Sequence, residues 1–172
     1  MMTLVSGGSK CGKSGYAEKL SEKFTGKKIY IATMQPYGQE AEQAIARHRE
    51  MRKNKNFLTL EQYTDIEKAE IPENSFVLIE CMGNLCANEI FSSGIENPTE
   101  KIISGIQEIK KRSEELVIVT NSVSRDGTEY TSETMNYIRR MGEINRKLAE
   151  ISDNVIECVC GIPVALKGKI YV

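Results

Sequence analysis

The sequence predicts an α/β fold in which helices flank a mainly parallel β-sheet. Short apolar runs alternate along the 172 residues with segments of helical periodicity. The runs are apolar throughout, which is typical of strands buried on both faces of a parallel sheet. No internal repeat or Pro/Ser-rich linker interrupts this alternation, so we expect a single domain over residues 1–172.

Five apolar runs are the predicted strands, and the tail adds a sixth candidate. The runs cover residues 3–6, 29–32, 76–79, 116–120 and 155–160. The tail, residues 164–172, is divided by Gly168 and is predicted to form a terminal hairpin or an antiparallel edge strand.

Helices are predicted between these runs, over residues 13–24, 40–53 and 132–151 and from residue 97 onwards. Asn97 at the cap, Pro98 at the first position and Glu100 at the third are typical of a helix start. Apolar residues at helical spacing predict the two buried stripes. These are Ile102, Ile106 and Ile109 in one helix, and Met135, Ile138, Met141, Leu148 and Ile151 in the other.

Composition excludes several classes of protein. Lys and Arg total 23 against 24 Asp and Glu, so the net charge of −1 gives no basic excess of the kind that nucleic-acid binding requires. No apolar segment is long enough for a membrane helix, and no secretion leader precedes the first strand. Five cysteines without metal-ligand spacing predict reduced thiols, and hence a cytoplasmic protein.

A phosphate-binding loop is the strongest motif in the chain. Gly7, Gly8, Ser9, Lys10, Cys11, Gly12, Lys13 and Ser14 fit the pattern G-x-x-x-x-G-K-S. The motif follows the first predicted strand and opens the first helix, so backbone N–H groups and the helix start can cradle phosphate. Lys13 is expected to reach the β- and γ-phosphates, and the Ser14 hydroxyl to ligate Mg²⁺. The fold is therefore predicted to be P-loop NTPase-like.

A second metal anchor is expected where another strand ends. Glu80 follows the apolar run 76–79 and could orient Mg²⁺ directly or through water. The residues alone leave equal room for a solvent-exposed carboxylate. The guanine-reading pattern N-K-x-D is missing near residues 119–122, which makes a regulatory GTPase less favoured than a small-molecule transferase.

His48 is the one histidine of the chain, and it lies on a predicted basic helix. By pattern alone an exposed histidine without a special role is favoured. The alternative is a nucleophile for an α-phosphate, with Arg49 and Arg52 neutralising the triphosphate.

Taken together, the segments resemble the adenosylcobinamide kinase / adenosylcobinamide-phosphate guanylyltransferase family along nearly the whole chain. The loop matches the family's G-G-[AS]-R-S-G-K-S, with Lys10 in place of the usual Arg. The matching segments are residues 7–14, 30–33 (Y-I-A-T), 48–52 (H-R-E-M-R), 59–61 (T-L-E), 78–81 (L-I-E-C), 119–121 (V-T-N), 142–149 and 161–167.

The resemblance implies two reactions. A nucleoside triphosphate phosphorylates the aminopropanol hydroxyl of adenosylcobinamide, and GTP then guanylylates the histidine matching His48 before GMP passes to the cobinamide phosphate. It implies GTP as a substrate, leaves ATP open as a phosphoryl donor, and suggests a homo-trimer. The implied nucleotide contacts beyond the loop are Thr33, Met34, Gln35, Arg49, Glu50, Met51, Arg52, Glu61 and Glu80.

The chain departs from the family pattern mainly in its C-terminal half. Ser122-Val123-Ser124 replaces Glu-Val-Gly after V-T-N, and residues 125–130 differ as well. The hypothesis that follows is that guanylylation is retained while cobinamide phosphorylation is weaker or narrower. Two other functions stay open: a P-loop kinase of another small molecule, and a nucleotide-binding regulatory protein without transfer chemistry.

Overall fold

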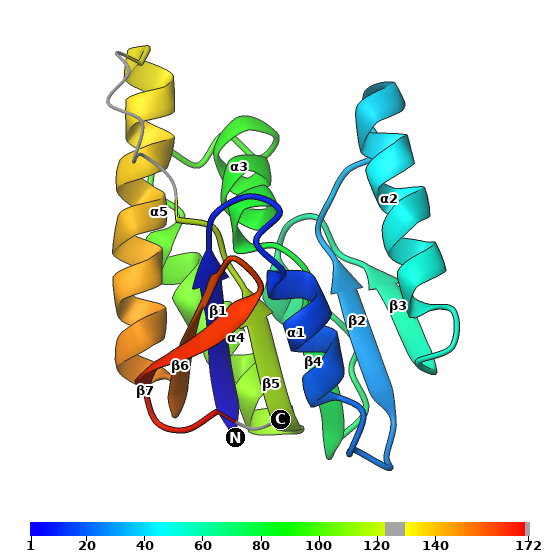
Figure 1. The fold of residues 1–172 in the computed structure, drawn as a ribbon. Coiled ribbons are helices and arrows are strands. Elements are labelled where there is room, and N and C mark those ends of the chain that lie inside the picture. The colour runs from blue at the N-terminus through cyan, green and yellow to red at the C-terminus, as the bar shows by residue number, and fades with distance from the viewer. Residues whose placement is uncertain (123–129, 171–172) are drawn as a thin grey trace.

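A seven-stranded sheet with helices on both faces forms the molecule (Figure 1). The computed structural model describes residues 1–122 and 130–170, without the side chains of Glu40 and Met51. The elements are β1 (Met2–Gly7), α1 (Lys13–Leu20), β2 (Lys28–Ala32), α2 (Gly38–Arg52), β3 (Phe57–Glu61), η1 (Ile66–Lys68), β4 (Ser75–Ile79), α3 (Met82–Phe91), α4 (Thr99–Arg112), β5 (Ser113–Val119), α5 (Ser132–Ile151), β6 (Asn154–Val159) and β7 (Ile162–Lys167).

The sheet confirms the predicted α/β class and its antiparallel edge. The strand order is β3-β2-β4-β5-β1-β6-β7, and every neighbouring pair is parallel except β6–β7. All five predicted strands are present. The predicted strand in residues 164–172 is confirmed in part, because β7 begins at Ile162 and ends at Lys167.

Three elements escaped prediction, among them the short 3₁₀ helix η1. β3 is a half-buried edge strand without the continuous apolar run that marks the central strands. Two residues separate α3 from the end of β4, and the helix has no side-chain cap that would signal its start.

Helix boundaries differ by a few residues from those predicted. The first helix was expected to reach residue 24 but ends at Leu20, where the Ser21 hydroxyl donates to the Glu18 carbonyl at 2.7 Å and closes the last turn. α2 begins at Gly38, two residues early. The Asn97 side chain accepts from the Thr99 amide at 3.2 Å, as the predicted cap of α4 requires. The helix itself begins at Thr99, two residues after Asn97.

Alternate residues of each central strand enter two separate apolar cores. Leu4 and Ile79 face the layer of α3, α4 and α5, where Leu85, Ile106 and Met141 are fully buried. Val5 and Leu78 face the opposite layer, where Ala17 of α1 packs. Figure 1 shows α1 in front of the sheet and α4 behind it. Because both faces are covered, the strands must be apolar throughout.

The parallel strands bring their carboxyl ends to one edge of the sheet, and this edge carries the polar residues of interest. The loop after β1, Thr33 after β2, Glu80 after β4 and Asn121 after β5 all lie there. Ligands of open α/β sheets bind outside this edge. Within the described residues, no helix has both the length and the apolar character that crossing a bilayer requires.

Leu85→Ala should lower the free energy of unfolding by about 2–5 kcal/mol, because Leu85 is fully buried between α3 and the sheet. The matched control is Leu58→Ala on β3, where the side chain is 60% exposed and a change within about 0.5 kcal/mol is expected. Urea unfolding of both variants measures the difference. Equal destabilisation would contradict the assignment of α3 to the core.

Candidate active site

The phosphate-binding loop has the shape that the motif requires. β1 ends at Gly7 and α1 begins at Lys13, so residues 8–12 turn the chain directly into a helix N-terminus. Gly12 has a φ of 96°, where a side chain would be strained, and a Cβ there would lie 3.3 Å from Cα of Gly161. Lys13 is 7% exposed, and its ammonium donates to the carbonyl oxygen of Gly8. The loop therefore folds around its own lysine, ready to exchange that carbonyl for a phosphate.

Glu80 and His48 meet at the end of β4. Glu80 is 6% exposed, and its Oε1 bonds to Nδ1 of His48, which comes from α2. The phenol of Tyr30 is buried beside Glu80, and burial followed by the Glu80 charge raises the pKa of Tyr30 well above its ordinary value. Tyr30 therefore keeps its proton next to the carboxylate. Glu80 has both the Tyr30 phenol and the His48 imidazole as neighbours.

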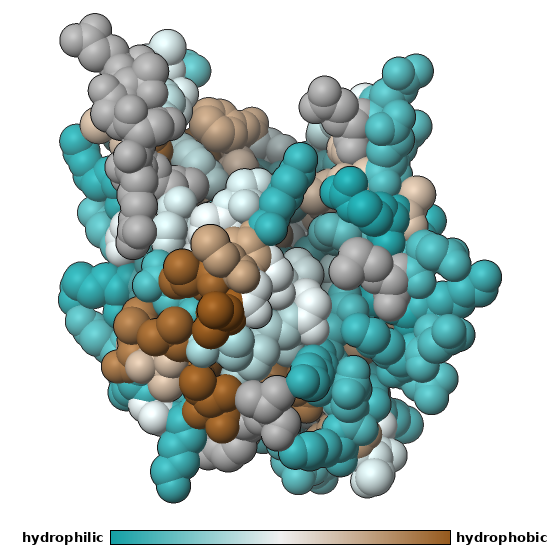
Figure 2. Space-filling model, in the orientation of Figure 1, coloured by the Kyte–Doolittle hydropathy of each residue, from teal (hydrophilic) through white to brown (hydrophobic). Residues whose placement is uncertain are grey.

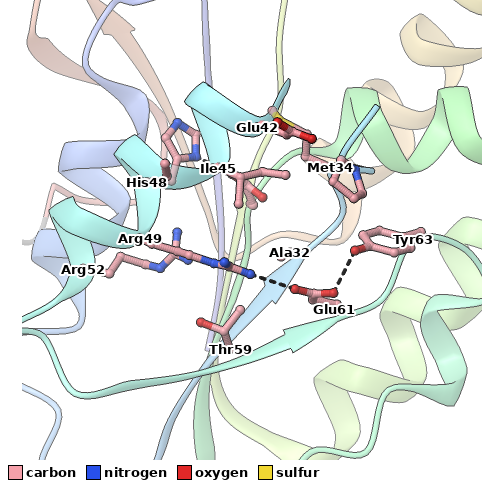
Figure 3. A pocket seen from close by; sticks show the side chains of 13 residues that line it. Ala32, Met34, Glu42, Ile45, His48, Arg49, Arg52, Thr59, Glu61 and Tyr63 are labelled. Atoms are coloured by element: carbon pink, nitrogen blue, oxygen red, sulfur yellow. Dashed lines mark hydrogen bonds and ion pairs between the residues drawn. The ribbon is translucent and has the colours of Figure 1, made fainter. Parts of the chain in front are cut away.

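Two cavities share the His48–Glu80 pair. One has a volume of about 210 Å³ and lies between α2, β2 and β3 (Figure 3). The other, of about 640 Å³, lies over the phosphate-binding loop. Met34, His48 and Glu80 line both of them. We call the first the side pocket and the second the loop cleft, and a ligand long enough to occupy both must pass His48.

Charged groups line the side pocket. Figure 3 shows Arg49 reaching across the pocket from α2 to Glu61, with Nη2 3.0 Å from Oε1. The Tyr63 hydroxyl donates to the other oxygen of Glu61 at 2.8 Å. Arg52 is 7% exposed, lies 3.4 Å over the ring of Tyr30, and has a buried Nη1 without a hydrogen-bond partner among the described residues. A buried guanidinium with an unused donor is suited to an anionic ligand.

The structure brings most of the predicted nucleotide contacts into these two cavities. The loop cleft is lined by Ser9, Lys10, Cys11, Gly12, Lys13, Ser14, Met34, His48 and Glu80, and the side pocket by Met34, His48, Arg49, Arg52, Glu61 and Glu80.

Other predicted residues lie outside the cavities. Thr33 is fully buried and its hydroxyl donates to the Cys81 carbonyl at 2.8 Å, which is a structural contact. Gln35 accepts from Ser92 at 3.4 Å, and Glu50 pairs with Lys53 at 3.7 Å on the exposed side of α2. The side chain of Met51 lies outside the described residues.

Sequence reasoning missed several lining residues. Arg47 and Asn121 line the loop cleft, and Glu42, Ile45, Thr59 and Tyr63 line the side pocket. Arg47 and Tyr63 could have been predicted, because each lies one or two residues along the chain from a predicted contact. Nothing in the local sequence marks Ile45, which the packing of α2 beside β3 brings into the pocket. Thr59 belongs to the T-L-E segment of the family resemblance but was not predicted as a contact.

The donors in the loop cleft suit a magnesium ion. The Ser14 hydroxyl and the Glu80 carboxylate line the same cleft, and both offer the oxygen ligands that Mg²⁺ prefers. In the described part of the chain, no group of three or more His, Cys, Asp or Glu side chains could hold a metal ion. An ion bound by one or two protein oxygens and by substrate phosphates fits this arrangement.

A helix-opening phosphate loop, a buried lysine and an acid at a nearby strand end define a P-loop nucleotide-binding protein. A family model described as cobinamide kinase / cobinamide phosphate guanyltransferase matches residues 3–166, and the chain belongs to that family. It is therefore an enzyme of this bifunctional class, which acts in cobalamin biosynthesis.

Relatives match the chain over its whole length. The bifunctional adenosylcobalamin biosynthesis protein CobU of Escherichia coli is 31% identical, over 97% of this chain and 100% of the relative. CobU of Salmonella typhimurium is 28% identical with the same coverage, and CobP of Pseudomonas aeruginosa is 25% identical over 98% of this chain and 99% of its own. A chain from a structure of a DnaB-like replicative helicase and its interactions with primase is 12% identical with a TM-score of 0.46, over 91% of this chain and 46% of that one, and nothing about function follows from it.

Lys13→Ala should weaken triphosphate binding and turnover, because it removes the buried ammonium at the loop. Loss of such a contact amounts to about 3 kcal/mol, or roughly a hundredfold. Lys19→Ala, an exposed lysine of the same helix, is the control and should bind GTP as the unmodified protein does. Titration calorimetry with GTP and Mg²⁺ gives both affinities, and equal affinities for the two variants would contradict the phosphate role of the loop.

Proposed function

We propose that the enzyme phosphorylates adenosylcobinamide with a nucleoside triphosphate and then transfers GMP from GTP to adenosylcobinamide phosphate through a guanylyl-histidine at His48. The observation that carries this proposal is the position of His48. It lies on Glu80 at the junction of the side pocket and the loop cleft. A nucleotide with its nucleoside in the side pocket and its terminal phosphates on the loop presents its α-phosphate to this histidine.

The contact with Glu80 prepares the imidazole for attack. An ionised carboxylate only accepts hydrogen bonds, so Nδ1 must carry the proton and Nε2 keeps its lone pair. Nε2 attacks the α-phosphorus of GTP, a nitrogen–phosphorus bond forms, and the bond to the bridging oxygen breaks. Pyrophosphate leaves with the electron pair. Glu80 stabilises the positive charge that develops on the ring, as the acid of a nucleophile–base–acid triad does.

The second half of guanylyl transfer reverses the roles at phosphorus. A phosphate oxygen of the cobinamide phosphate attacks the α-phosphorus, the nitrogen–phosphorus bond breaks, and neutral His48 is restored with adenosylcobinamide-GDP as product. Arg49 and Arg52 in the side pocket supply positive charge beside the α-phosphate, and the unused Nη1 of Arg52 has a donor to spare. Bound Mg²⁺, held by Ser14 and Glu80, would neutralise charge on the phosphates.

The nucleoside is assigned to the side pocket on chemical grounds. The Glu61 carboxylate is fixed by Arg49 and Tyr63, and it faces the pocket as a hydrogen-bond acceptor (Figure 3). Guanine presents two adjacent N–H donors that a carboxylate can accept together, whereas adenine does not. This supports GTP as the guanylyl donor and leaves the phosphoryl donor open between GTP and ATP.

Self-association is part of the proposal. Apolar side chains gather over β7 at the edge of the sheet (Figure 2), where Ile162, Val164 and Leu166 are 65%, 42% and 62% exposed. An uncovered apolar edge strand of this kind is suited to pairing with another copy of the chain. The resemblance suggests a trimer. The five free cysteines favour a reducing compartment, in keeping with a cytoplasmic enzyme.

GTP labelled on its α-phosphate should label the protein covalently in the presence of Mg²⁺, and pyrophosphate should remove the label. A phosphoramidate has a good leaving group once its nitrogen is protonated, so the label should be lost in acid and survive in base. His48→Asn should abolish labelling, and no second histidine can replace it. Acid-stable label, or full labelling of His48→Asn, would contradict the guanylyl-histidine and favour a P-loop kinase of another small molecule. GTP binding without any transfer would favour a regulatory protein.

Glu80→Gln should slow guanylylation of His48 by about a hundredfold or more. The amide can donate to Nδ1 and so favours the wrong tautomer, as replacement of the acid in a catalytic triad does. The requirement for Mg²⁺ should rise as well, because one carboxylate charge is lost. Glu22→Gln, on the exposed turn after α1, is the matched control. Rapid-quench labelling at several Mg²⁺ concentrations measures both effects, and an unchanged rate would make Glu80 a bystander.

A further inference from the structure

The strand order places the parts of the site in sequence along one edge of the sheet. The side pocket includes the ends of β3 and β2, at Glu61 and Ala32. Glu80 and His48 follow at β4, then Asn121 beyond β5, and finally the phosphate-binding loop after β1. In the proposed function, a nucleotide that extends from the side pocket to the loop would place its α-phosphate at His48 and its terminal phosphates between Asn121 and Lys13.

The main chain at Asn121 is fixed from both sides. The Thr120 amide donates to the Val5 carbonyl at 2.9 Å, and the Ser122 amide donates to the Gly7 carbonyl at 3.2 Å, so this segment is bonded to β1 and to the start of the loop. On the other side, Asn145 of α5 accepts from the Thr120 hydroxyl at 2.6 Å and donates to the Asn121 carbonyl at 3.2 Å. Asn121 is thus held at a set position relative to the phosphate-binding loop.

The side-chain amide of Asn121 has only a weak partner. Its Nδ2 lies 3.8 Å from Sγ of Cys81. A cysteine sulphur is only a weak hydrogen-bond acceptor. Among the described residues that line the loop cleft beyond β4 and β5, namely Cys81, Val119 and Asn121, Asn121 alone carries a side-chain N–H donor. A phosphate oxygen would be a much stronger acceptor than this thiol.

We propose that Asn121 is a catalytic residue for phosphoryl transfer, in which its side-chain amide donates to an oxygen of the terminal phosphate, opposite Lys13. This rests on the proposed function. The acceptor hydroxyl attacks the γ-phosphorus, the bond from that phosphorus to the bridging oxygen breaks, and nucleoside diphosphate leaves with the electron pair. The hydroxyl proton passes to water. The amide transfers no proton and acts by stabilising charge on the equatorial oxygens.

The two reactions therefore use different residues along the same edge of the sheet. His48 acts on the α-phosphorus from α2, and Asn121 acts on the γ-phosphorus from the end of β5. Ser122, which stands where the family pattern has Glu, contributes its main-chain amide to Gly7. Among residues 120–122, Asn121 is the one that lines the loop cleft.

The test compares Asn121→Ala and Asn121→Asp in the two half-reactions. Phosphorylation of adenosylcobinamide should fall about a hundredfold or more in kcat for both variants, with KM changed little, because removal of one preorganised donor has an effect of this size. Aspartate keeps the shape but offers no donor and adds a negative charge, so it should be at least as slow as alanine. Guanylylation of His48 by α-labelled GTP should stay within about threefold of the unmodified rate.

Asn84→Ala is the matched control. Asn84 belongs to the first turn of α3 beside this wall, and its buried Nδ2 has no partner among the described residues and lies outside both cavities. It should change neither half-reaction. Thermal unfolding of each variant shows that the fold is kept, and Asn121→Asp serves if Asn121→Ala does not fold.

Equal loss of both half-reactions, or loss of neither, would overturn the role of Asn121. An unmodified protein that labels on His48 without phosphorylating the corrinoid would also overturn it, while leaving guanylyl transfer intact. An unmodified protein that phosphorylates without labelling would instead remove the histidine from the proposed function. The loss of phosphorylation in the Asn121 variants, compared with Asn84→Ala, would then still decide this inference.

Discussion

The contact between His48 and Glu80 is the interaction on which the geometry of the site depends. α2 stands beside the sheet with little apolar anchoring, since Arg52 is its one buried side chain among those described (Figure 1). Polar contacts attach it instead: His48 to Glu80, Arg52 to the ring of Tyr30, and the exposed Arg49 to Glu61. Tyr30 is buried beside Glu80, so the first two contacts meet at one buried cluster. That cluster holds the proposed nucleophile between the two cavities.

The parallel sheet places this contact in line with the other polar parts of the site. Because all parallel strands end at one edge, neighbouring strands present their polar residues side by side there. From β3 to β1 the edge carries the side pocket, His48 with Glu80, Asn121 and the phosphate-binding loop, in that order. The proposed function matches this order to the nucleoside, the α-phosphate and the terminal phosphates of a nucleotide. One bound nucleotide geometry can in this way serve two reactions at different phosphorus atoms, which fits a bifunctional family.

Much of the fold and part of the site could be predicted from the sequence. Continuous apolar runs identified the five central strands, and the loop motif located Lys13 and Ser14 because phosphate binding requires a particular residue order. β3 and α3 escaped because partial burial leaves no continuous run and α3 lacks a capping side chain. The partnership of Glu80 with His48 joins residues 32 apart in the chain, and only the packing of α2 across the sheet edge brings them together. Asn121 lies in the V-T-N segment of the family resemblance, but its place in the cleft depends on the strand order.

The most direct test of the central claim is the nitrogen to which GMP becomes attached. Protein carrying ¹⁵N-histidine contains a single labelled imidazole, so phosphorus–nitrogen coupling after reaction with GTP and Mg²⁺ can be read without ambiguity. Glu80 holds Nδ1 of His48, which leaves Nε2 as the free lone pair. We expect coupling to Nε2, with Nδ1 still bearing its proton. Attachment at Nδ1 would contradict the proposed role of Glu80, because it would mean that Glu80 does not orient the nucleophile.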